Sequence, residues 1–180
     1  MIEPQQGLSY EEQLAIAQRV ESSGFEALFR SDHYQSFPGP AGLPTTDAWA
    51  VLAGLARETS RIHLGSAVLI LPYRPALPTA KAIATIQELS DGRLELGVGV
   101  GRMEAEFRAV GAVLRDRGRV SDEVLEFFRA AFDAPDDIAV SKGQAFLFRP
   151  NPARPRIWIG GAAPHALARA VRFGDGWLPM

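Results

Sequence analysis

Short apolar runs alternate along this chain with segments whose apolar residues recur at helical spacing. The apolar runs include residues 27–29, 62–71, 94–98 and 156–159, and helical segments separate most of them. Such alternation is typical of repeated βαβ units built around a parallel sheet. No linker or internal repeat divides the sequence, so we expect residues 1–180 to form a single α/β domain.

Capping residues mark the ends of several helices. Ser9 followed by Glu12 forms a capping box, and Gly24 suits the turn that ends the same helix. Asp47 is predicted to cap the next helix, and Ser121 is predicted to cap a later one.

Three stretches interrupt this pattern. Residues 34–46 are rich in proline and glycine, and they predict a long loop of the kind that is usually functional or mobile. Residues 133–142 predict a second loop, and residues 144–148 predict a short hairpin arm outside the main sheet. Within the run 62–71, Gly65-Ser66-Ala67 predicts a bulge or a close ligand contact.

Glycine recurs at every second position where one strand meets the following helix. Gly97, Gly99 and Gly101 form a G-x-G-x-G pattern, which differs from the G-x-G-x-x-G of a dinucleotide fold. A missing Cβ lets another backbone or a ligand approach closely. The glycines either relieve crowding between the strand and its covering helix or admit a ligand, and the spacing alone fits both interpretations.

The residues that follow the predicted strands are unusual in several places. These strand ends are Asp32-His33, residues 71–74, residues 99–102 and residues 160–163. Because the carboxyl ends of parallel strands meet at one edge, where α/β proteins bind their ligands, we expect all four to lie on one rim.

The three histidines have different expected roles. His33 brings to this rim an imidazole suited to proton transfer near neutral pH, although it could instead cap its strand. His63 lies inside a strand and is expected to be a structural histidine with a satisfied partner. His165 lies in the first turn of a helix that follows Gly160-Gly161-Ala162-Ala163, where free N–H groups can bind phosphate, unless the segment is a plain turn.

The composition narrows the class of protein. The chain is 47% hydrophobic and 22% charged with a formal net charge of −2, and the absence of a basic run argues against nucleic acid as a partner. No apolar stretch approaches the ~20 residues of a membrane span. Cysteine is absent, and the histidines lack metal-ligand spacing. We therefore expect a cytoplasmic protein with no membrane or metal partner.

Taken together, the motifs resemble those of the bacterial luciferase-like flavin-dependent oxidoreductases, and most of all the branch that uses the deazaflavin coenzyme F420. The resemblance covers nearly the whole chain and keeps the family's order. It rests on Pro4-Gln5-Gln6-Gly7, Phe29-Arg30-Ser31-Asp32-His33, Thr46-Asp47-Ala48-Trp49, Arg61-Ile62-His63-Leu64-Gly65, Ser90-Asp91-Gly92-Arg93, Gly97-Val98-Gly99-Val100-Gly101, Ile157-Trp158-Ile159-Gly160-Gly161 and Asp175-Gly176-Trp177.

This resemblance implies a TIM-type (β/α)8 barrel and an oxidoreductase that acts on a small organic substrate by hydride transfer or monooxygenation. The implied cofactor is reduced F420, with FMN as the alternative. A full barrel takes ~250 residues. We therefore expect a partial barrel whose first strand is reduced to residues 1–3 and whose strands seven and eight are missing. The open edges predict a homo-oligomer, and a non-catalytic fragment is the second hypothesis for this chain.

The resemblance also implies site residues. His33 is the implied catalytic acid or base, and a bulged third strand with a non-proline cis peptide at Ala67–Val68 is implied behind the cofactor ring. In a sugar-phosphate dehydrogenase of the family, an acidic general acid follows the glycine turn; Arg102 stands there in this chain, so that substrate and mechanism do not carry over. The implied cofactor-binding residues are Asp32, Ser66, Ala67, Val68, Val100, Gly101, Gly160, Gly161, Ala162, Ala163 and His165.

Overall fold

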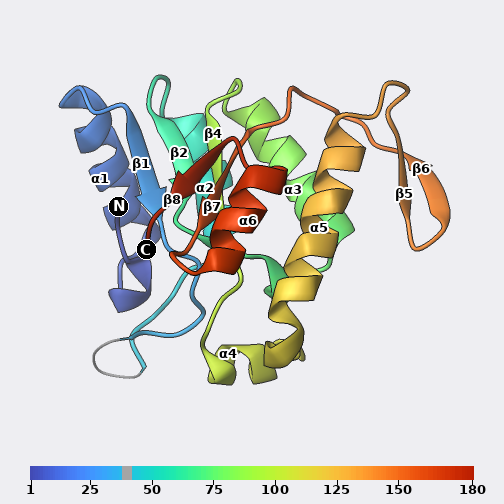
Figure 1. Ribbon diagram of the computed structural model, residues 1–180. Coiled ribbons are helices and arrows are strands. Elements are labelled where there is room, and N and C mark those ends of the chain that lie inside the picture. Colours follow the sequence, from blue (N-terminus) through green and yellow to red (C-terminus); the bar gives the residue numbers. More distant parts are fainter. Residues whose placement is uncertain (38–41) are drawn as a thin grey trace.

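The main sheet of the protein is entirely parallel, as the sequence predicts. The computed structural model describes residues 1–37 and 42–180, so part of the predicted loop 34–46 lies outside the described residues. The strands follow one another in the order β1-β2-β4-β7-β8, with β3 beside β4 (Figure 1). Their bounds are β1 Ala27–Arg30, β2 His63–Ser66, β3 Leu69–Ile70, β4 Leu94–Gly99, β7 Arg156–Gly160 and β8 Gly176–Leu178.

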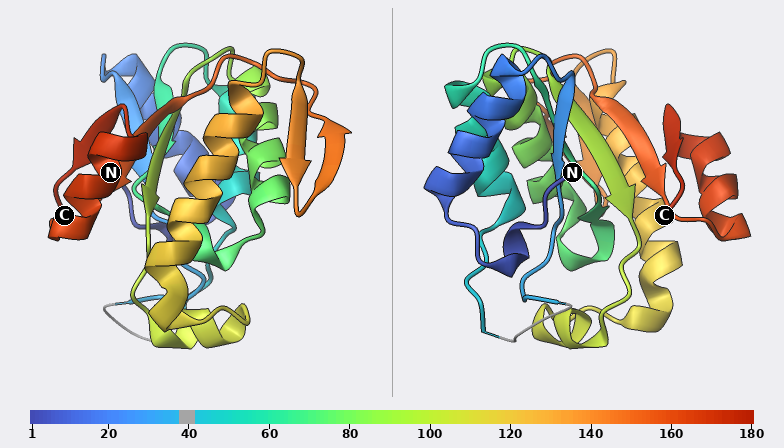
Figure 2. Two further views of the ribbon diagram at one scale, coloured as in Figure 1. Left: turned by 45° about the vertical axis from the view of Figure 1, so that its right-hand side comes forward. Right: turned by 90° about the vertical axis from the view of Figure 1, so that its left-hand side faces the viewer.

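Helices connect these strands and pack on one side of the sheet, as the side view in Figure 2 shows for α1, α2 and α3. Their apolar faces and the strand residues between them form a buried core that includes Leu52, Leu64 and Leu96. No helix of the described residues is long and apolar enough to cross a membrane. The helices are α1 Tyr10–Ser22, α2 Ala48–Glu58, α3 Ala76–Leu89, α4 Glu104–Ala109, α5 Arg117–Phe132 and α6 Pro164–Phe173, with 3-10 turns η1 Pro4–Gln6, η2 Leu71–Tyr73 and η3 Leu114–Asp116.

Two predicted caps are confirmed. Ser9 Oγ accepts a hydrogen bond from the Glu12 N–H, and the Glu12 side chain accepts one from the Ser9 N–H, which completes the capping box of α1. Asp47 Oδ1 accepts a bond from the Ala50 N–H at the start of α2, 2.9 Å away.

Two sequence predictions are wrong, one in α5 and one in the segment that follows it. Ser121 lies inside α5 and does not cap it, because the helix begins one turn earlier and the Ser121 hydroxyl donates to the Arg117 carbonyl at 2.7 Å. The predicted loop 133–142 contains β5 (Ile138–Ser141), which pairs antiparallel with β6 (Gln144–Leu147). The hairpin itself is confirmed, and it stands apart from the main sheet (Figure 1).

The glycines of β4 make room for the neighbouring strand. A Cβ at Gly97 would lie 2.0 Å from the Ser66 carbonyl oxygen, and one at Gly99 would lie 2.4 Å from Cγ2 of Val68. Between β2 and β3 the chain makes a cis peptide at Ala67–Val68, as the resemblance implied. Gly97 and Gly99 thus relieve crowding that comes from this interrupted strand, whereas at Gly101 both Ile70 of β3 and Phe107 of the following helix are close.

The first strand of the expected barrel is reduced to a single bridge. Ile2 pairs in parallel with Arg30, and its N–H donates to the Phe29 carbonyl at 2.8 Å. At the other side of the sheet, β8 pairs with β7 alone among the described residues. The described sheet is therefore open at both edges, as expected of a partial barrel, with its strand carboxyl ends together on one rim.

Candidate functional site

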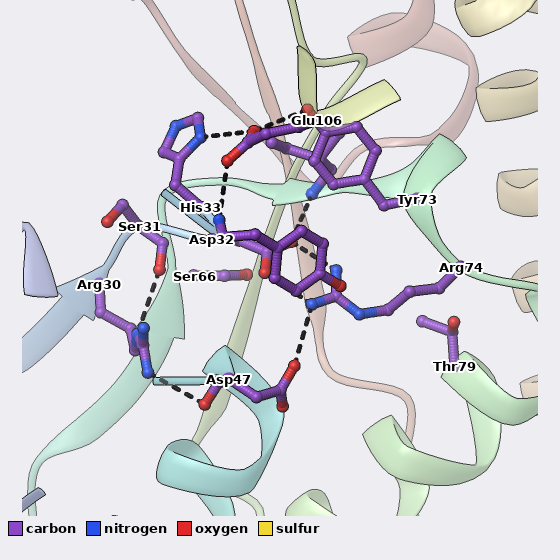
Figure 3. A network of polar contacts seen from close by, with 12 residues as sticks. Arg30, Ser31, Asp32, His33, Asp47, Ser66, Tyr73, Arg74, Thr79 and Glu106 are labelled. Atoms are coloured by element: carbon purple, nitrogen blue, oxygen red, sulfur yellow. Dashed lines mark hydrogen bonds and ion pairs between the residues drawn. The ribbon is translucent and has the colours of Figure 1, made fainter. Parts of the chain in front are cut away.

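Polar side chains from several elements meet at this rim (Figure 3). Asp32 and His33 directly follow β1, Tyr73 and Arg74 come from the end of η2, and Glu106 comes from α4. The sequence places these residues up to 74 positions apart, and the parallel sheet brings them together because each element leaves a strand at the same edge.

Asp32 is a buried anchor of the rim. Its side chain is 2% exposed. Its carboxylate accepts two hydrogen bonds from the Arg74 guanidinium, at 2.6 and 2.7 Å, and one from the Ile70 N–H at 3.0 Å. Burial alone would lower the pKa of Arg74, but the bond and charge of Asp32 outweigh it and raise that pKa. Arg74 therefore keeps its charge, and its bonds to Asp32 tie the end of β1 to η2 while the Ile70 N–H ties it to β3.

Arg30 joins the same rim to the start of α2. Its guanidinium donates to the carbonyl oxygens of Thr46 and Asp47 at 3.0 and 3.2 Å. Burial lowers the pKa of Arg30 to about 10, against the opposing effect of the Asp32 and Asp47 charges. Asp47 in turn lies 3.2 Å from Arg74, although its side chain is largely solvated.

His33 is held by a carboxylate. Its Nδ1 lies 3.0 Å from Oε2 of Glu106, and the Tyr73 hydroxyl donates to the same oxygen at 2.8 Å. The other Glu106 oxygen accepts from the Tyr34 N–H at 2.7 Å. The His33 side chain is 17% exposed, whereas Glu106 is 2% exposed. The imidazole is thus partly exposed with one nitrogen fixed by Glu106, and this side-chain partner takes the place of the expected strand cap.

The predicted ring-site residues lie beside this network. Ser66 is buried and donates to the Gly97 carbonyl at 2.7 Å, while Ala67 and Val68 are half-buried. Gly101 has φ +72°, and a Cβ there would lie 2.5 Å from Cγ2 of Ile70.

A separate cleft of about 810 Å³ holds the other predicted cofactor residues. Its wall includes Val100, the segment 160–163 and His165, together with arginines of α5 and α6 such as Arg169. Ala163 precedes α6 and offers no side-chain cap to the first-turn N–H groups. The N–H groups of Ala162, Ala163 and His165 are the donors here that fit a phosphate, because Arg169 and Arg172 are already paired with Asp122 and Glu126 of the same wall. Asp32 and His33 do not line this cleft, so the predicted residues form two neighbouring groups.

Sequence reasoning missed Glu106, and it gave Tyr73 and Arg74 no role beyond their place on the rim. The signal in the sequence was the acidic first turn of the helix after the glycine strand, whereas the family pattern pointed to the position of Arg102. His63 is confirmed as a satisfied strand histidine, since its Nδ1 lies 2.8 Å from Oε1 of Glu95.

Across residues 1–37 and 42–180, no group of three or more His, Asp or Glu is placed to hold a metal ion.

Known proteins resemble this chain in sequence and in fold. The chain is 29% identical over 181 residues to an F420-dependent hydroxymycolic acid dehydrogenase of Mycobacterium tuberculosis, covering 92% of this chain and 48% of the relative. The fold of this chain matches that of an F420-dependent secondary alcohol dehydrogenase solved with an F420-acetone adduct. The TM-score is 0.79 and the identity 20%, over 96% of this chain and 54% of the other. It also matches the FMN complex of the oxygenating constituent of 3,6-diketocamphane monooxygenase from Pseudomonas putida, with a TM-score of 0.75 and 16% identity over 95% and 53% of the two chains.

The chain spans only part of the length of these proteins. Curated relatives are covered over 46% to 66% of their length. The family model for luciferase-like monooxygenases nevertheless matches residues 2–180. The chain therefore belongs to the luciferase-like monooxygenase family.

Proposed function

We propose that this chain is an oxidoreductase that uses reduced deazaflavin F420 for hydride transfer to, or monooxygenation of, a small organic substrate. The observation that carries the proposal is that two groups lie side by side at the carboxyl ends of the strands. One is the imidazole of His33 held by the Glu106 carboxylate, and the other is a set of N–H donors that could bind a phosphate. The F420-dependent relatives support the choice of cofactor.

Two groups of residues would hold the cofactor. The N–H groups of Ala162, Ala163 and His165 would bind its phosphate, because anions bind well at an uncapped helix start, and Gly160 and Gly161 would allow it to approach closely. The half-buried Ala67, Val68 and Val100, with Gly101 beside them, would contact its ring. Ser66 would support the ring site indirectly, because its hydrogen bond to the Gly97 carbonyl fixes β2 against β4.

His33 would supply proton transfer, and Asp32 would keep the rim in shape beside it. A bound reduced deazaflavin would supply a hydride, so the protein would have to supply or accept the accompanying proton. His33 is the partly exposed histidine of this rim, and imidazole is the side chain best suited to proton transfer near neutral pH. The Asp32 carboxylate is already bonded to Arg74 and to the Ile70 N–H, so Asp32 would contact the cofactor only at the edge of the cofactor ring.

FMN is the alternative cofactor, since a structural neighbour is an FMN-dependent monooxygenase with the same fold. Flavin and deazaflavin share a ribityl phosphate, so the α5–α6 cleft would serve both. A chain that binds the cofactor without turnover, or only together with another chain, is the remaining alternative, because this sequence spans about half of its F420-dependent relative.

Self-association and a cytoplasmic location are part of the proposal. The described sheet is open beyond β8 and beyond the Ile2 bridge, and unpaired strand edges favour pairing with another chain.

Equilibrium titration with each oxidised cofactor tests the proposal, followed by the absorbance or fluorescence of the cofactor. We expect tighter binding of F420 than of FMN. Ala162→Asp puts a negative charge into the cleft and is expected to weaken both cofactors by about tenfold or more, which corresponds to about 1.4 kcal/mol. Ala15→Asp, on an exposed position of α1 outside the cleft, is the matched control and should bind as the wild type does.

Three results would count against this proposal in different ways. Tight FMN binding with none for F420 would overturn the cofactor, and binding of neither would favour the inert alternative. Equal cofactor affinity of the wild type and Ala162→Asp would show that the α5–α6 cleft is not part of the cofactor site.

A further inference from the structure

Glu106 has an unusual position for an acidic side chain. It lies on the short helix α4, yet its side chain is almost fully buried and points toward the end of β1 (Figure 3). Three donors from two segments converge on it: the His33 ring and the Tyr34 N–H after β1, and the Tyr73 hydroxyl of η2. A buried carboxylate is costly unless it is fully bonded, so this arrangement fixes the positions of its partners.

The donor count determines which ring nitrogen of His33 carries a proton. A backbone N–H can only donate, and the buried Tyr73 hydroxyl has Glu106 as its acceptor, so the carboxylate is used as an acceptor at both oxygens. A bare Nδ1 at 3.0 Å from Oε2 would set one lone pair against another. Nδ1 must therefore be the protonated nitrogen.

The pKa directions agree with this geometry. Burial alone would raise the pKa of Glu106, but the bonds from His33, Tyr73 and the Tyr34 N–H lower it below its usual value. Burial and the bond to Glu106 raise the pKa of Tyr73. At neutral pH, Glu106 is thus the anion and Tyr73 the neutral donor.

We propose that Glu106 is a positioning residue that holds neutral His33 as its Nδ1–H tautomer and so leaves Nε2 as the nitrogen that exchanges a proton with the substrate. The proposal deepens the proposed function and rests on the assignment of His33 as its acid or base. A carboxylate that orients an imidazole through Nδ1–H is a recurrent way of fixing which nitrogen reacts.

The other charged groups around His33 do not compete for Nδ1. Asp32 is bonded to Arg74, which also lies over the ring of Tyr34 with its guanidinium carbon 5.2 Å from the centroid. The guanidinium carbon of Arg102 lies 5.9 Å from the centroid of the Phe37 ring, and that ring packs at 80° to the imidazole with the two centroids 4.4 Å apart.

The test is ¹⁵N NMR of the histidine rings in the full chain without cofactor, recorded from pH 5 to 9 with long-range ¹H–¹⁵N correlations. His33→Ala identifies the His33 signals among the three histidines. We expect wild-type His33 to show the Nδ1–H pattern once neutral. In Glu106→Gln, the ring is expected to move toward the Nε2–H form that imidazole favours in water. Tyr73→Phe also removes one bond from Glu106 but leaves the carboxylate on His33, so this matched control should keep the Nδ1–H pattern.

The outcome does not depend on turnover. A wild-type Nε2–H spectrum overturns the proposal whatever cofactor the chain binds, and the wild-type spectrum decides even if Glu106→Gln fails to fold. A folded Glu106→Gln that is less stable but keeps the Nδ1–H tautomer also overturns it, because Glu106 would then be purely structural. An Nδ1–H spectrum that is lost in Glu106→Gln and kept in Tyr73→Phe supports the positioning role even where cofactor titration contradicts the oxidoreductase function.

Discussion

His33→Ala is expected to lower turnover by about 10²–10⁴-fold, the usual contribution of a positioned general acid or base. Folding should change little, because Glu106 keeps two other donors and the imidazole is partly solvated. The measurement is the rate of cofactor absorbance change with a substrate that the wild type turns over, together with the melting temperature of each protein.

His63→Ala is the matched control. His63 is the first residue of β2, at the opposite end of that strand from the rim, and its ring contacts Glu95. We expect this variant to lose some stability and keep its turnover. Parallel losses of melting temperature and of turnover in His33→Ala would show that His33 is structural instead.

Asp32→Asn is expected to lower the free energy of unfolding by about 3–5 kcal/mol, the range for removing one partner of a buried ion pair. The physical reason is that Arg74 would keep its charge in a half-buried place with a neutral partner, while the Ile70 N–H keeps only a weaker acceptor. Urea denaturation measures the change.

Asp47→Asn controls for the loss of charge near Arg74. The Asp47 side chain is 45% exposed and lies 3.2 Å from Arg74, and such solvated pairs contribute about 0–1 kcal/mol. Asparagine keeps the side-chain oxygen that caps α2. Similar losses in the two variants would contradict the view of Asp32 as the buried anchor of the rim.

Local chemistry explains why much of the fold could be predicted from the sequence. The capping box at Ser9 and the cap at Asp47 depend on residues three positions apart, so the sequence contains all the information they need. The error at Ser121 has an equally local cause, since a serine inside a helix can bond back to the carbonyl four residues earlier instead of capping.

The site was less predictable because its contacts are not local. His33 could be placed at a strand end from the sequence, but its partner Glu106 lies 73 residues further on. The contact depends on how α4 is oriented, so that Glu106 faces the end of β1, and the sequence pattern showed only an acidic helix start. The bonds of Asp32 to Arg74 likewise depend on how the chain passes from β3 into η2.

A crystal structure of the chain with oxidised F420 tests the central claim most directly, namely that the rim and the α5–α6 cleft together form one cofactor site. We expect the ring to contact Ala67, Val68 and Val100 beside His33, with the phosphate on the N–H groups at the start of α6. Density for the cofactor on any other face, or a phosphate bound away from residues 160–165, would contradict the account.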